Sequence, residues 1–144
     1  WKYCRDRDEV ARKLEEKLSD LREREVLPGD IAILSPRPFA SSSVSLLPAQ
    51  LRNGIEILSQ DSTAKLNSRK ILFSTVEDFK GLERSYVLAL DFSTLRDFGP
   101  DLSHLYVAMS RPRAGLWIAL HQSLGKQIRE KMINHTLSDS PEGL

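Results

Sequence analysis

Short apolar segments recur along this chain, and polar or amphipathic segments separate them. The segment Ile31–Leu34 contains no polar residue, which is typical of a strand covered on both faces. Apolar runs that alternate with helical patterns predict a parallel sheet with helices on both faces, an α/β fold. The strands that we predict are Trp1–Cys4, Ile31–Leu34, Ile55–Leu58, Ile71–Thr75, Ser85–Leu90 and Gly115–Leu120.

The clearest helical pattern covers Asp8–Arg24. Its apolar residues recur three or four positions apart, at Val10, Leu14, Leu18 and Leu21, and charged residues occupy the other positions. Asp6 or Asp8 could cap the start, and Glu9 suits the first turn. Further helices are predicted at Leu46–Leu51, Val76–Leu82, Leu102–Ser110 and Ser123–Ile133.

Composition sets the broad class of protein. A length of 144 residues, 40% of them hydrophobic and 28% charged, fits one globular domain. A net charge of +1 gives no general basic surplus, so any contact with nucleic acid must be local. Cys4 is the single cysteine, which excludes an internal disulfide and agrees with a cytoplasmic location. No segment is long and apolar enough to suggest a membrane partner, and the start at Trp1 suggests a piece of a longer protein.

The segment Thr75–Glu83 follows a predicted strand. In an α/β sheet, ligands bind beyond the carboxyl ends of the strands, so we expect this segment at the ligand edge. Gly81 allows close backbone approach or a positive φ angle, and Lys80 and Glu83 flank it. The alternative is an ordinary strand-to-helix turn with two solvated charged side chains.

The segment Leu105–Arg113 places Arg111 at the end of a predicted helix. Arginine suits a phosphate because its planar guanidinium donates two parallel hydrogen bonds and stays charged. The alternative is a surface arginine that the helix dipole favours, and Arg113 fits that role better than Arg111 does.

Together these two segments resemble the fifth and sixth motifs of superfamily 1 helicases of the UvrD/Rep type. The fifth motif has the form Thr-x-His-x-x-Lys-Gly-Leu-Glu, and the sixth has the form Tyr-Val-(Gly/Ala)-x-(Ser/Thr)-Arg-Ala. The resemblance implies a second RecA-like motor domain over residues 1–134, with no large accessory insertion, and a flexible tail over 135–144. It also implies roles by position. Arg111 would be the arginine finger, Gly81 and Glu83 would lie at the nucleotide, and Thr75 and Lys80 would contact single-stranded nucleic acid, DNA by preference.

The chain departs from the family pattern in ways that matter. Glu77 replaces the histidine of the fifth motif, and a carboxylate there would repel a DNA phosphate. Pro112 replaces the alanine that follows the finger. No phosphate-binding loop is present, because the one Gly-Lys pair, at Gly125, lacks the earlier glycine. Asp91 superficially matches a Walker B aspartate, but we interpret it as a strand-end residue.

Two functions therefore remain open. The first is the C-terminal motor half of a UvrD-like DNA helicase or DNA-dependent ATPase, which does not hydrolyse ATP as an isolated chain. ATP and Mg²⁺ would be bound mainly by the N-terminal RecA-like domain of the same protein. The alternative is a degenerate, non-catalytic RecA-like module that binds nucleic acid or another protein. His104, His121 and His135 lack ligand spacing, so the sequence predicts no metal site.

Overall fold

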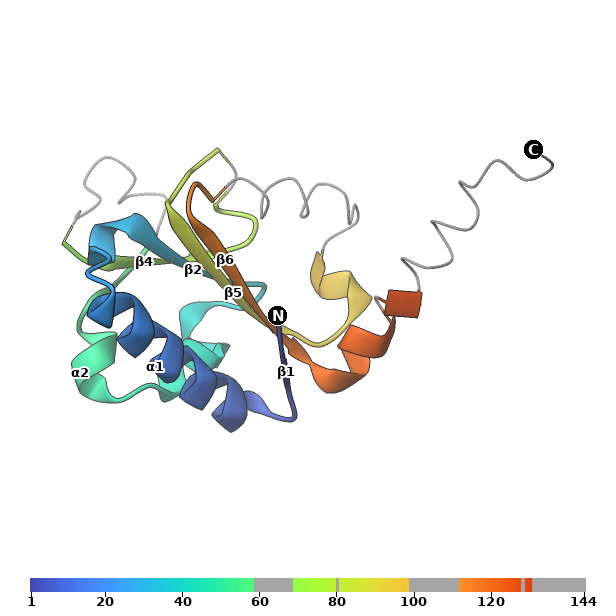
Figure 1. Cartoon of the computed structure of the whole chain (residues 1–144). Helices are drawn as coiled ribbons and strands as arrows, with labels where there is room; N and C mark the ends of the chain where they lie inside the picture. The colour runs from blue at the N-terminus through green and yellow to red at the C-terminus, as the bar shows by residue number, and fades with distance from the viewer. Residues whose placement is uncertain (59–68, 80, 99–111, 128, 131–144) are drawn as a thin grey trace.

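A computed structural model describes residues 1–58, 69–79, 81–98, 112–127 and 129–130 of the chain. Its centre is a six-stranded sheet with the order β1-β6-β5-β2-β4-β3, in which every pairing is parallel (Figure 1). The strands are β1 (Lys2–Cys4), β2 (Ile31–Ser35), β3 (Ile55–Ile57), β4 (Ile71–Thr75), β5 (Tyr86–Phe92) and β6 (Gly115–His121). The predicted α/β fold with a parallel sheet is confirmed.

The apolar runs became strands because both faces of the sheet are covered. All five residues of β2 are buried, and four consecutive residues are buried in both β5 and β6. Successive side chains of a strand point to opposite faces. Accordingly, Ile33 and Leu88 belong to one core cluster, whereas Ala32 and Leu34 belong to the other.

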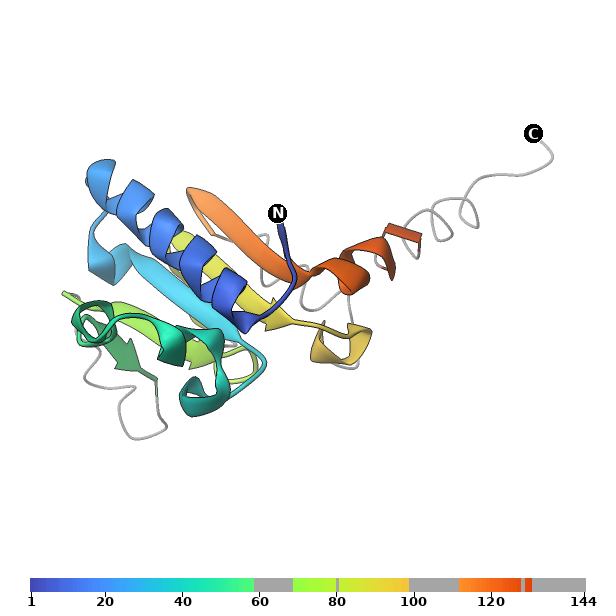
Figure 2. The same cartoon turned by 90° about the horizontal axis from the view of Figure 1, so that it is seen from below.

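Helix α1 (Arg7–Glu23) covers one face of the sheet, as Figure 2 shows. Its buried residues Leu14 and Leu21 join the first core cluster, together with Val44 and Leu47 from the segment before the short helix α2 (Ala49–Arg52). The opposite face carries the second cluster, which includes Phe79 from the turn after β4 and Leu124 from helical residues 122–127. The described part of the chain thus places apolar cover on both faces.

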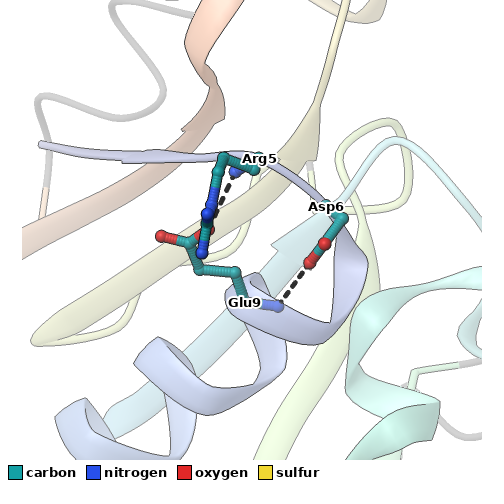
Figure 3. A network of polar contacts seen from close by, with 3 residues as sticks. All are labelled: Arg5, Asp6 and Glu9. Atoms are coloured by element: carbon teal, nitrogen blue, oxygen red, sulfur yellow. Dashed lines mark hydrogen bonds and ion pairs between the residues drawn. The ribbon is translucent and has the colours of Figure 1, made fainter.

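The start of α1 is fixed by Asp6, one of the two cap candidates in the sequence, together with Glu9 (Figure 3). Asp6 is the N-cap, and its Oδ1 accepts the Glu9 backbone N–H at 2.9 Å. Glu9 reaches back, and its Oε2 accepts the Arg5 backbone N–H at 3.1 Å and the Arg5 Nε–H at 3.0 Å. This arrangement is a variant of the capping box, shifted one residue toward the N-terminus. It ties the end of β1 to the first turn of α1.

Several sequence predictions need adjustment. Within the predicted helix Val76–Leu82, residues 76–79 form turns, and Phe79 packs in the second core cluster. The predicted helix Leu102–Ser110 and the tail 135–144 lie outside the described residues. No helix among the described residues is long and apolar enough to cross a membrane.

We predict that Asp6→Ala lowers the free energy of unfolding by about 0.5–2 kcal/mol, because the first turn of α1 loses its cap. Urea denaturation followed by circular dichroism measures this change. Asp8→Ala is the matched control, since Asp8 lies in the same turn but is not the cap residue. Equal losses in the two variants would contradict the capping role.

The ion pair of Glu9 predicts a pH dependence. The hydrogen bond from the Arg5 side chain, followed by that from the Arg5 backbone, lowers the pKa of Glu9 below its ordinary value. A carboxyl group whose pKa is lower in the folded state stabilises the fold above its unfolded pKa, about 4.3, and loses that contribution as the pH falls through the folded value. We expect Glu9→Gln to flatten the acid limb of a plot of unfolding midpoint against pH. An unchanged acid limb would show that the pair adds nothing to stability.

Candidate functional site at the carboxyl edge of the sheet

Strands β2 and β5 are neighbours, and the chain leaves their carboxyl ends in opposite directions. After β2 it runs toward β3 on one side of the sheet, and after β5 it runs toward β6 on the other. Ligands of open α/β sheets bind where connections diverge in this way. The residues that mark this point are Ser35, at the end of β2, and Asp91, near the end of β5.

Asp91 sits in an irregularity of β5. Its φ angle is 68°, and the register of β5 on β6 shifts between Ala89 and Phe92. Its Oδ2 accepts the Ser35 Oγ–H at 3.0 Å and the Ser43 backbone N–H at 2.9 Å, and its Oδ1 accepts the Ser43 Oγ–H. Both carboxylate oxygens are therefore engaged, by the last residue of β2 and by the segment that follows it. This agrees with Asp91 as a structural strand-end residue and not a magnesium ligand.

A cavity of about 210 Å³ opens beside this cluster, at the carboxyl ends of β1, β6 and β5. Arg7 at the start of α1, Arg37 in the segment after β2 and His121 at the end of β6 contribute polar side chains to its wall. Sequence reasoning missed these residues because no motif links them. Only the strand order brings positions 4–10, 37, 91–93 and 119–121 together, and that order was not predicted.

Thr75 ends β4 at the same edge of the sheet. Its side-chain Oγ1 accepts the Asp78 backbone N–H at 3.3 Å, and its carbonyl accepts the Phe79 N–H at 3.2 Å. These bonds turn the chain away from the edge. Gly81 has a φ angle of 84°, so the positive φ that its identity suggested is observed. Lys80 lies outside the described residues.

Glu83 lies at the other end of the sheet. Its Oε2 is 3.4 Å from Arg113 Nη2, and the nearby Ser85 carbonyl accepts the N–H groups of Ala114 and Gly115 at the start of β6. Our expectation that the whole segment 75–83 occupies the carboxyl edge is right for Thr75 and wrong for Glu83. The reason is topological, because the chain must return to the amino edge to begin β5 parallel to β4.

The sequence-predicted site is therefore divided. Thr75 is at the carboxyl edge, Gly81 and Glu83 lie in the crossing segment between β4 and β5 (residues 76–85), and Arg111 lies outside the described residues. The roles of these residues in binding stay predictions. No group of three or more His, Cys, Asp or Glu residues in the described part of the chain could hold a metal ion. Compared with known proteins, the chain matches no family model and no curated protein.

We predict that Asp91→Ala destabilises the fold by about 2–4 kcal/mol. It leaves three donors without their acceptor and places alanine at a positive φ angle. Urea unfolding at pH 7 measures the loss. Asp78→Ala is the control. The exposed Asp78 side chain makes no hydrogen bond or ion pair with the described residues, so its change should stay within about 0.5 kcal/mol. A similar small effect at Asp91 would show that the network is dispensable.

Proposed function

We propose that the chain is the second RecA-like motor domain of a UvrD-like superfamily 1 DNA helicase or DNA-dependent ATPase. The observation that carries this proposal is the course of residues 75–83, the segment that resembles the fifth motif. It begins with Thr75 at the carboxyl end of β4 and reaches Glu83 beside Arg113, near the amino ends of β5 and β6. One continuous segment thus joins two opposite edges of the sheet.

A segment that joins the two edges of the sheet is suited to couple nucleic-acid binding at one edge to nucleotide binding at the other. In the proposal, Thr75 and Lys80 contact single-stranded nucleic acid, and Gly81 and Glu83 lie against the nucleotide. Phe79 is buried between these two ends, and in the proposal this packed residue would carry a shift from one end to the other. No described atom lies within 4 Å of a Cβ added at Gly81, which leaves the backbone there open to a ligand.

Arg111 is proposed as the arginine finger. Its guanidinium would neutralise charge that develops on the transferred phosphoryl group. Mg²⁺ bound with ATP would supply further charge neutralisation. The described residues offer no group of three metal-ligating side chains, and the sequence has no phosphate-binding loop. The proposal therefore assigns both ATP and Mg²⁺ mainly to an N-terminal RecA-like partner domain of the same protein.

One observation favours the alternative, a non-catalytic RecA-like module. Glu77 and Asp78, two and three residues after Thr75, are both exposed. Two carboxylates at the proposed nucleic-acid edge would repel phosphates, and their effect would fall with added salt. A module that binds a protein instead of a single strand would not meet this conflict.

We predict that Arg111→Ala, made in the natural protein that carries both motor domains, lowers ATP turnover about 10³-fold or more. Steady-state ATPase assays with and without single-stranded DNA measure the change. Arg113→Ala is the matched control. Its side chain is 78% exposed and forms a surface ion pair with Glu83 over 3.4 Å. Because such exposed pairs contribute little, its loss should leave turnover near normal.

The two functions differ in these assays. DNA-stimulated turnover that disappears in Arg111→Ala and persists in Arg113→Ala supports the motor with Arg111 as its finger. Near-normal turnover in Arg111→Ala would contradict the finger. An absence of turnover in the wild type under every condition would favour the non-catalytic module.

A further inference from the structure

The last residue of β2 lies at a junction of three strand ends. Ser35 is fully buried and pairs with Thr75 at the last rung of the β2–β4 ladder. Its backbone carbonyl accepts the Val76 N–H at 3.0 Å, directly after β4 ends. Its side-chain Oγ–H donates to Asp91 Oδ2, near the end of β5, at 3.0 Å. One residue of β2 is therefore bonded to the ends of both neighbouring strands.

The β5 side of this junction has an unusual backbone. Asp91 has a φ angle of 68°, and the register of β5 on β6 shifts between Ala89 and Phe92. A residue with a Cβ keeps a left-handed conformation inside a strand where its surroundings hold it there. Here the carboxylate accepts hydrogen bonds from Ser35 and from both the backbone and the side chain of the fully buried Ser43. The irregularity of β5, the carboxylate and the two serines thus form one unit.

The polar groups of this unit have their partners. Ser35 Oγ accepts the Arg37 backbone N–H at 3.1 Å, in addition to the bond that it donates. Among the described residues, no buried side-chain nitrogen or oxygen lacks a hydrogen-bond partner. A fully satisfied buried polar network makes a structure rigid, and removal of one member leaves the others unpaired at a cost. A change at one member of the unit is therefore felt by the others.

The turn after β4 depends on this unit for its position. Thr75 Oγ1 accepts the Asp78 backbone N–H, and the Thr75 carbonyl accepts the Phe79 N–H, but both bonds lie within the turn. Phe79 packs in the second core cluster and anchors the far end of the turn. At the near end, the bond from the Val76 N–H to the Ser35 carbonyl ties the turn to β2.

We infer that Ser35 and Asp91 are positioning residues for Thr75, because the irregularity of β5 holds the turn after β4 in place through Ser35. Neither residue needs to touch a ligand for this role. The consequence for binding rests on the proposed function, in which Thr75 contacts single-stranded nucleic acid. A loosened junction then weakens that contact although Thr75 itself is unchanged. The coupling between Asp91 and Val76 is independent of that function.

Three variants separate the hydrogen bonds from the backbone conformation. Ser35→Ala removes the hydroxyl at the centre of the junction. Asp91→Gly removes the carboxylate but permits the positive φ angle. Asp91→Asn keeps an acceptor oxygen, places an amide donor beside a hydroxyl that can also accept, and tolerates the left-handed conformation, so it should preserve the junction. Ser41→Ala is the matched control, because Ser41 is exposed and its hydroxyl donates to the Pro38 carbonyl.

The first readout is the hydrogen–deuterium exchange rate of single backbone amides, measured on this chain by two-dimensional NMR. We expect Ser35→Ala and Asp91→Gly to raise the exchange rate of the Val76 N–H about tenfold, because its acceptor loses support. Asp91→Asn and Ser41→Ala should leave that rate close to the wild-type value. The Ile71 N–H is the internal control, since it donates to the Gly54 carbonyl at 3.0 Å at the opposite end of β4. A general loss of stability raises both rates, whereas a local loss raises only that of Val76.

The second readout is the affinity of the natural protein with both motor domains for fluorescently labelled oligo(dT), measured by anisotropy. We expect Ser35→Ala and Asp91→Gly to raise Kd about threefold or more, and Asp91→Asn to leave it near the wild-type value. A purely structural role would not produce this split between two substitutions of the same aspartate.

The outcomes decide the junction and the function separately. Faster exchange at Val76 with an unchanged rate at Ile71 supports the junction. An unchanged rate at Val76, or an equal rise at both amides, overturns it. Fast exchange at Val76 in Asp91→Asn overturns the role of the hydrogen bonds. Selective exchange without any change in Kd overturns the positioning of Thr75 for nucleic acid. Wild-type protein that does not bind oligo(dT) contradicts the proposed function, and the exchange rates still decide the junction.

Discussion

Parallel pairing governs this structure more than any single contact does. Each of the five strand pairings is parallel, so the chain must travel from the carboxyl edge back to the amino edge before it can begin another strand. Helix α1 makes the first of these returns, and the segment 76–85 makes the return between β4 and β5. The same rule brings the carboxyl ends of all six strands to one edge. Both the candidate site and the crossing segment follow from it.

The cap at the start of α1 serves this topology. Strand β1 has three residues and lies at the sheet edge, so it contributes little burial of its own. The bonds among Arg5, Asp6 and Glu9 fix the turn at which the chain leaves β1 and crosses to β2. At the far end of the helix, Glu25 adopts a φ angle of 60°, the left-handed conformation that commonly ends helices. A side-chain cap thus marks the start of the longest described helix, and a left-handed backbone conformation marks its end.

Much of the fold could be predicted from the sequence, and the candidate site could not. Runs such as Ile31–Leu34 indicate strands because burial on both faces demands apolar residues at every position. The spacing of Leu14 and Leu18 indicates α1 for a similar reason. Strand order leaves no such local trace, since it depends on which apolar surfaces meet. The cavity between Arg7, Arg37 and His121 was therefore invisible in the sequence, whereas Gly81 and Asp91 stood out as single residues and both proved to have positive φ angles.

The arrangement of the carboxyl edge bears on how one strand of nucleic acid could use it. Thr75 ends β4, and the cavity lies at the ends of β5, β6 and β1. β4 and β6 are three strand positions apart, which is about 14 Å at the usual spacing of parallel strands. Arg37 follows β2, the strand between β4 and β5. A single strand that ran along this edge would meet Thr75, then the Arg37 guanidinium, then the cavity. With a net charge of only +1, such a path would depend on local cations such as Arg37, and the exposed Glu77 and Asp78 beside Thr75 would oppose it.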